Sequence, residues 1–322
     1  MTEKEAEDLC KMIRVGVDLS PKKYQPRTKE KLKDLIEKLI EERGNEADLN
    51  DIDVSQIEDM SEVFAHSQFN GDISNWDVRK VENMNEMFQG SEFNGDISKW
   101  KVSSVKSMYR MFEESRFNGD ISKWDVSNVR NMECMFLGSQ FNSNVSKWNV
   151  SKVKNMSCMF CRSQFNGDIS DWDVGGVVSM SSMFHGSQFN GDISKWNVSS
   201  VKSMQDMFYN SQFNGDISNW NVSSVENMGG MFCGSPFNGD ISNWNVSKVR
   251  KMSAMFHKSQ FNNDISKWDV SKVEDMSWMF SRSEFNGDIS NWNVSEVWSM
   301  KGMFEESQFN GDISKWFKKP TK

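Results

Sequence analysis

The chain has 322 residues, with 46 acidic against 38 basic side chains and a net charge of −8. The first 46 residues carry 11 acidic and 11 basic side chains, so the whole negative excess lies on the remainder. Such a surface repels phosphate groups, which argues against nucleic acid or an anionic membrane as the main partner. No run of about 18 apolar residues occurs, so we expect no transmembrane segment.

The first residues also bear on location. Residues 1–8 are acidic, whereas a secretory signal begins with basic residues followed by an apolar run. Five cysteines, an odd number at irregular positions, are typical of free thiols in a reducing compartment. By sequence we therefore expect a cytoplasmic chain without a signal peptide, unless a leader has been removed. No cofactor is expected.

Two helices are predicted before the rest of the chain begins. Thr2 and Glu5 have the spacing of a capping box, which predicts a helix over residues 3–16. Thr28 is the predicted N-cap of a second helix, which should end near Gly44. Each helix has one apolar face, so we expect residues 1–46 to form a helical N-terminal cap over the first repeat. A separate partner-binding hairpin is the alternative.

The remainder is a tandem repeat. Eleven tryptophans recur every 24 residues, from Trp76 to Trp316, and a fixed period of this length predicts a solenoid. Residues 47–68 are a degenerate first repeat, residues 69–316 are the tandem 24-residue repeats, and residues 317–322 are a tail.

Within one repeat the apolar spacing changes once, which indicates two kinds of structure. Ile73, Trp76, Val78 and Val81 follow the leucine-rich-repeat spacing, which predicts a short strand over residues 75–78. Val81, Met84, Met87 and Phe88 then recur as on one face of a helix of about ten residues.

Glycines at the position of Gly90 would follow the end of that helix as C′ residues. We therefore expect an α/β solenoid, with a parallel sheet of short strands on one face and short helices on the other.

The return segment carries an Asn-Gly pair in nine of eleven copies, which predicts a turn with positive φ at glycines such as Gly71. Ser143 and Asn263 replace the glycine in two copies. Asn70 and Asp72 recur because hydrogen-bonded ladders would satisfy the turns. A calcium site at the aspartates is disfavoured, since the glycine-rich spacing of calcium-binding solenoids is missing.

The repeat pattern F-N-G-D-I-S-x-W-x-V-S-x-V-x-x-M-x-x-M-F resembles the BspA-like leucine-rich repeats of bacterial surface proteins, especially the mycoplasma-type lipoprotein repeats of unknown function. The resemblance covers residues 47–316. It implies a right-handed leucine-rich-repeat-like coil on a cell surface, used for adhesion or host interaction. Two features depart from the pattern: Val81 stands where the family's ladder Asn is usual, and the surface-targeting leader is absent.

The residues on either side of the inward tryptophan should face solvent on the open sheet face. This broad polar face is the candidate partner-binding surface, because repeat proteins bind partners on such faces. Its candidate partner-facing residues are Asp77, Lys101, Asp125, Asn149, Asp173, Asn197, Asn221, Asn245, Asp269 and Asn293. The alternative is an ordinary solvated surface.

The sequence contains two further clusters, one of cysteines and one of tryptophans. Cys134, Cys158, Cys161 and His185 could form a zinc patch, but helices packed 8 to 10 Å apart would hold them too far apart, so no metal site is predicted. Trp278 and Trp298 are expected to form an exposed aromatic patch.

Catalytic motifs are lacking in the sequence, which has no nucleophile with a partner histidine and no phosphate loop. We therefore expect a non-enzymatic scaffold that binds protein or glycan. A passive spacer of variable copy number is the alternative, and ice binding fits poorly because the ladders are not rich in threonine. End-to-end self-association through the last coil is a further expectation.

Overall fold

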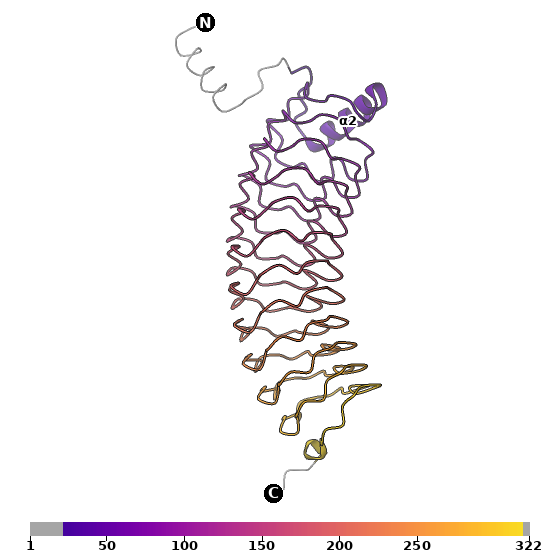
Figure 1. The fold of residues 1–322 in the computed structure, drawn as a ribbon. Coiled ribbons are helices and arrows are strands. Elements are labelled where there is room, and N and C mark those ends of the chain that lie inside the picture. The colour runs from indigo at the N-terminus through magenta and orange to yellow at the C-terminus, as the bar shows by residue number, and fades with distance from the viewer. Residues whose placement is uncertain (1–21, 318–322) are drawn as a thin grey trace.

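The computed structural model describes residues 22–317 and shows one elongated, gently curved stack of coils. Helix α2, Lys29–Arg43, lies at one end of the stack, and the short 3-10 helix η1, Ser314–Phe317, lies at the other (Figure 1). The described residues contain no strand and no helix other than these two. The predicted α/β solenoid, with strands on one face and helices on the other, is therefore wrong.

Helix α2 confirms the second predicted helix. The side chain of its N-cap, Thr28, accepts the N–H of Lys31, and Gly44 ends the helix with its N–H on the carbonyl of Ile40 at 2.8 Å. Its buried residues join the core of the first coils through one apolar face. These residues are Leu32, Ile36 and Leu39. The helix predicted over residues 3–16 lies outside the described residues.

Successive coils stack in parallel register. An unbroken series of isolated parallel bridges joins residues 24 apart, from Asp59 and Asn83 to Asp275 and Ser299. Each bridge involves a single residue per coil, which is why no continuous sheet forms. We call residues that occupy the same position in successive coils a column, and name each column by its member between residues 69 and 92.

The segment predicted as a helix is a run of tight turns. The N–H of Met87 donates to the carbonyl of Met84 at 3.4 Å, and the N–H of Ser91 donates to the carbonyl of Phe88 at 3.2 Å. The third residue of each turn has positive φ, 57° at Glu86 and 59° at Gly90, as in type II turns. Two consecutive turns put apolar side chains three and four residues apart, which is also the spacing along one face of a helix.

These turns also join the coils. The N–H groups of Met84, Glu86, Phe88 and Gly90 all donate to carbonyls of the following coil, at 2.7 to 3.1 Å. An α-helix would have used the same N–H groups internally. The Glu86 and Gly90 columns have positive φ in all eleven coils, and neither contains Val, Ile or Thr.

Turns also replace the predicted strand over residues 75–78. The N–H of Trp76 donates to the carbonyl of Ile73 at 3.1 Å, and that of Val81 donates to Val78 at 3.0 Å. The chain therefore changes direction on both sides of the tryptophan. The spacing of Ile73, Trp76, Val78 and Val81 places all four side chains in the core without an extended segment.

The core contains three aromatic columns beside columns of Ile, Val and Met. Neighbouring rings lie 6.4 Å apart at Trp76 and Trp100 in the Trp76 column, and 5.5 Å apart at Phe88 and Phe112 in the Phe88 column. The Phe69 column, which includes Phe93, is similar, and the ring of Phe93 lies 4.5 Å from the ring of Phe88. The expectation that the tryptophans point inward is confirmed, since Trp76 is 4 % exposed.

The Asn-Gly pairs do not form the predicted turns with positive φ. Gly95 has no positive φ; a Cβ atom there would lie 2.9 Å from the ring of Phe93. The glycine therefore leaves room for the aromatic ring two residues earlier, and its conformational freedom is not used.

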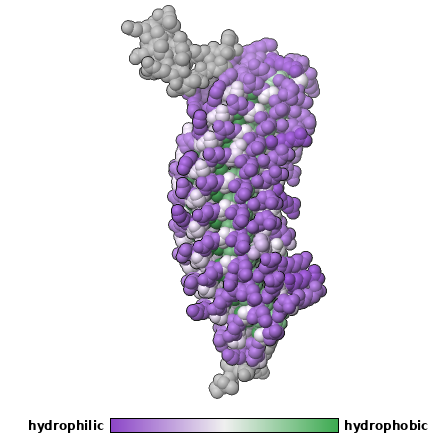
Figure 2. Space-filling view, in the orientation of Figure 1, coloured by the Kyte–Doolittle hydropathy of each residue, from purple (hydrophilic) through white to green (hydrophobic). Residues whose placement is uncertain are grey.

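The surface is almost entirely polar. Figure 2 shows rows of hydrophilic residues along the visible face, with a narrow line of hydrophobic residues between them. Among the described residues, Val178 and Trp298 are the only large hydrophobic side chains that are exposed. Any ligand that binds the sides of the stack therefore meets mainly hydroxyl, amide and charged groups.

Candidate binding surfaces

The Asp77 column lies where the sequence predicts, beside the buried tryptophans and facing solvent. Its members from Lys101 to Asn293 are all exposed, and Asp77 itself is half-buried. The surface around them is built from turns and not from a sheet. The ten candidate residues are thus brought into one line along the stack.

Each Asp or Asn of this column also has a structural task. The Oδ1 atom of Asn221 accepts the N–H of Ser223 at 3.2 Å, and that of Asp269 accepts the N–H of Ser271 at 3.1 Å. The Ser271 hydroxyl and N–H hold the pKa of Asp269 below its usual range. These Asx turns explain why the position is restricted to Asp and Asn in nine of ten copies. Solvent exposure alone does not explain this restriction, which is visible in the sequence.

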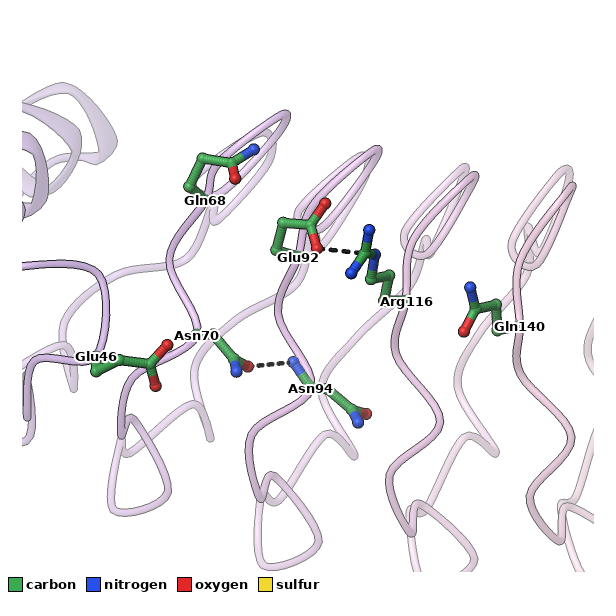
Figure 3. A pocket seen from close by; sticks show the side chains of 7 residues that line it. All are labelled: Glu46, Gln68, Asn70, Glu92, Asn94, Arg116 and Gln140. Carbon is green, nitrogen blue, oxygen red and sulfur yellow. Dashed lines mark hydrogen bonds and ion pairs between the residues drawn. The ribbon is translucent and has the colours of Figure 1, made fainter.

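A polar cleft that the sequence did not point to lies along the first coils. It has a volume of about 440 Å³ and is shown in Figure 3. Within it the guanidinium of Arg116 pairs with Glu92 at 2.8 Å, and the N–H of Asn94 donates to Oδ1 of Asn70 at 2.7 Å. The cleft is lined by Glu46, Gln68, Asn70, Glu92, Asn94, Arg116 and Gln140.

The Asn70 column explains this surface. Each Asn Oδ1 accepts the N–H of the Asn in the next coil, from Asn70 to Asn310. This confirms the expected asparagine ladder. Asp96 instead accepts the N–H of Ser98 within its own coil at 2.9 Å. Oxygen atoms of both columns are thus committed to backbone turns and to the stack, which leaves the cleft as a shallow polar surface.

The cysteine cluster is closer together than packed helices would allow. Cys134 and Cys158 occupy the Glu86 column in neighbouring coils, which are joined directly by backbone hydrogen bonds and not by packed helices. The spacing argument against a zinc patch is therefore wrong. Even so, within residues 22–317 no three His, Cys, Asp or Glu side chains are arranged to hold a metal ion.

We call the side of the stack formed by residues 84–91 and their equivalents in the other coils the turn face. His185 lies on it, one coil after Cys161. Its ring stacks on Tyr209 at 4.6 Å with an interplanar angle of 7°. Burial lowers the pKa of His185 and raises the pKa of the nearby Asp206 carboxyl. Both shifts are in the direction that favours the neutral form of the group.

The predicted aromatic patch forms only in part. Trp298 is 73 % exposed. Trp278 is half-buried, and its ring occupies the space that a Cβ atom at Gly302 would need. Because residue 302 is a glycine, the ring of Trp278 can pack against the next coil. Of the two tryptophans, only Trp298 projects into solvent.

Comparison with known families gives one match. Three consecutive segments, residues 32–142, 137–236 and 233–321, match a family described as Mycoplasma protein of unknown function, DUF285. Together they cover most of the chain. The chain belongs to the DUF285 family. No curated protein and no solved structure matches it.

The DUF285 match supports a tandem-repeat family and the mycoplasma part of the resemblance. It does not support a leucine-rich repeat, and the turn-based coils described above have neither the strand nor the helix of that fold. In the described part of this DUF285 chain no helix is both long enough and apolar enough to cross a membrane.

Proposed function

We propose that this DUF285 chain is a non-catalytic scaffold that binds an extended protein or glycan through the Asp77 column. The observation that carries the proposal is the column itself: exposed amide and carboxylate groups repeat once per coil along the length of the stack. Ligands with regularly repeated hydrogen-bonding groups suit such a surface, because several weak contacts then act together.

The Asx turns favour binding by holding these side chains still. In Asn197 and Asn245 the Oδ1 atom accepts the N–H of the serine two residues later, at 3.2 Å in both cases. The amide Nδ2 is then oriented before a ligand arrives. Immobilising a free side chain on binding costs about 0.5–1.5 kcal/mol, and much of this cost is avoided here. Trp196 and Trp220, which precede column members, are buried, so they fix the backbone beneath the surface.

The test compares two triple variants. The first carries Asn197→Lys, Asn221→Lys and Asn245→Lys; Lys101 already occupies this column, so lysine is compatible with the fold. The matched control places the same three charges in the Glu92 column, where Arg116 stands naturally. Its substitutions are Gln188→Lys, Gln212→Lys and Gln260→Lys, all at exposed positions.

Ligands are first identified with the unchanged chain on glycan arrays and by pull-down, and affinity is then measured by titration calorimetry. We expect the first variant to lose roughly tenfold or more in affinity and the control to lose little, since each lost hydrogen bond costs about 0.5–1.5 kcal/mol. Equal losses in both variants, or no ligand for the unchanged chain, would contradict the proposal.

A passive spacer is the second candidate function, and the uniform 24-residue stacking favours it. Deleting residues 189–236 removes two complete copies and leaves the register of all other columns intact. A spacer would tolerate this change without loss of any measured binding. For a binding scaffold we expect a weaker affinity, because two of the repeated contacts are gone.

A further inference from the structure

Three thiols meet on the turn face near the middle of the stack. Cys134 and Cys158 occupy the Glu86 column in consecutive coils, and Cys161 follows Cys158 across a turn in which its N–H donates to the carbonyl of Cys158 at 3.1 Å. Cys134 and Cys161 are buried and Cys158 is partly exposed. The binding surface proposed above does not use this cluster.

The stacking sets the distance between Cys134 and Cys158. The N–H of Cys134 donates to the carbonyl of Ser157 at 2.9 Å, so the two coils are directly bonded at this point. Two residues further on, the rings of Phe136 and Phe160 lie 5.7 Å apart with an interplanar angle of 4°. Asn131 and Asn155, three residues before the two cysteines, form a parallel bridge. Segments paired in this way lie about 4.8 Å apart, within the Cα separation of about 4.4–6.8 Å that a disulfide needs.

The surroundings of Cys158 favour its thiolate. Hydrogen bonds from the thiols of Cys134 and Cys161 and from the hydroxyl of Ser182 lower the pKa of Cys158, and His185 lies close by. The hydrogen bonds to Cys158, together with burial, raise the pKa values of Cys134 and Cys161, so these two thiols keep their protons. The partly exposed sulfur is thus the reactive one, and a buried thiol lies on each side of it.

We propose that Cys158 is a peroxide-sensitive cysteine and that Cys134 traps its oxidised form as a disulfide between neighbouring coils. The Cys158 thiolate attacks one oxygen of hydrogen peroxide, forming a sulfenic acid and releasing hydroxide. The Cys134 thiol then attacks the Cys158 sulfur, and the sulfenic hydroxyl leaves as water after taking the thiol proton. Two electrons pass from the two thiols to the peroxide, and the new bond fastens one coil to the next.

Peptide mapping tests this pairing in the full-length chain. All proteins carry Cys10→Ser, so that only the four described cysteines remain. Trypsin cleaves after Arg130, Lys147, Lys154 and Arg162, so Cys134 lies on peptide 131–147 and Cys158 and Cys161 share peptide 155–162. After treatment with hydrogen peroxide we expect the two peptides to be joined, and still joined in the Cys161→Ser variant.

The remaining variants identify the attacking sulfur. In Cys134→Ser the link should be lost, and dimedone, which reacts with sulfenic acids, should label Cys158. Serine is compatible with this column because Ser182 occupies it. Cys233→Ser is the matched control and should leave the link unchanged.

Alkylation rates of the unoxidised protein give an independent readout. Cys158 should react with iodoacetamide at least roughly tenfold faster than Cys233, whose pKa burial raises to about 11. A bond confined to peptide 155–162, loss of the link in Cys161→Ser, or equal alkylation rates for Cys158 and Cys233 would overturn the proposal.

Discussion

The indole N–H of Trp196 donates to the main-chain carbonyl of Ile169 in the preceding coil, at 3.0 Å. Every tryptophan of the column makes this bond with the residue 27 positions earlier, from Trp76 with Leu49 to Trp316 with Ile289. The Ile169 carbonyl also accepts the main-chain N–H of Trp172 at 3.2 Å, so the indole is its second donor. Tryptophan thus contributes both its ring and a hydrogen bond that joins neighbouring coils.

Replacing this tryptophan separates the two contributions. Trp196→Phe keeps most of the ring but removes one of the two donors of the Ile169 carbonyl, which still accepts the main-chain N–H of Trp172 at 3.2 Å. We therefore expect a loss of roughly 0.5–1.5 kcal/mol in the free energy of unfolding. Trp196→Ala also opens a cavity and should cost roughly 3–5 kcal/mol. Urea denaturation measures both. The exposed Trp298 is the control, and Trp298→Phe should stay within about 0.5 kcal/mol of the unchanged chain.

The positive φ of the Glu86 column predicts a strong dependence on side-chain shape. Ala254 has φ of 53° at the third residue of its turn. Ala254→Val should destabilise the fold by roughly 1–2 kcal/mol more than Ala254→Gly, because a β-branched residue is strained in the left-handed region.

Ser253 is the matched control for this pair. It precedes Ala254 in the same turn and has no positive φ, so Ser253→Val should cost clearly less than Ala254→Val. Thermal unfolding of the three variants measures these differences in stability. Equal losses of stability for Ser253→Val and Ala254→Val would contradict the assigned turn.

Two glycines of one column should respond differently to alanine. At Gly71 a Cβ atom would overlap with the carbonyl oxygen of Ala47, whereas at Gly239 it would meet only the ring of Phe237 at 2.8 Å. Ser143 and Asn263 stand naturally in this column, so the ring can adjust where the backbone does not interfere. We expect Gly71→Ala to cost about 1–3 kcal/mol and Gly239→Ala less than about 1.5 kcal/mol, as judged by urea denaturation.

Acid should weaken the stack through the Asp72 column. Hydrogen bonds from the N–H and hydroxyl of Ser194 lower the pKa of Asp192 below its reference value of 3.8. The folded chain therefore binds fewer protons than the unfolded chain in this range. The stabilisation is complete above the unfolded pKa and is lost as the pH falls through 3.8 and the lower folded value.

Asparagine tests the origin of this pH dependence. Asn144 replaces the aspartate in one coil, and its Oδ1 accepts the N–H of Ser146 at 2.9 Å. Substituting Asn at Asp192, Asp216 and Asp240 should keep the turns and make the urea midpoint fall less steeply between pH 5 and pH 2. An unchanged slope would show that other carboxylates determine acid stability.

The period and the inward side chains could be predicted from the sequence, but the local conformation could not. Met84, Met87 and Phe88 point into the core in either a helix or a pair of type II turns, so apolar spacing does not separate the two. The distinguishing signal was the mixture of Gly with Glu, Arg, Asn, Cys and Ser in the Glu86 and Gly90 columns. Those columns avoid β-branched residues because their φ is positive.

The candidate surface could be predicted only in part, because apolar spacing shows which side chains face outward but not how the coils meet. Alternation around Trp76 placed Asp77 outside, which holds for turns as well as for a strand. The cleft around Arg116 depends on residues of several coils meeting across the stack, and a single repeat gives no indication of it. The proximity of Cys134 to Cys158 likewise follows from direct bonding between coils.

The turn columns give the stack an electrical direction. In each coil four peptide groups, such as the one linking Asn83 to Met84, hold their carbonyl toward the preceding coil and their N–H toward the following one. Peptide dipoles of about 3.5 D aligned in this way add along the axis, as they do in a helix. The end of these turns that faces the C-terminus is thus partly positive, and the end that faces the N-terminus is partly negative. Carboxylates and carbonyl oxygens should therefore bind preferentially at the C-terminal end.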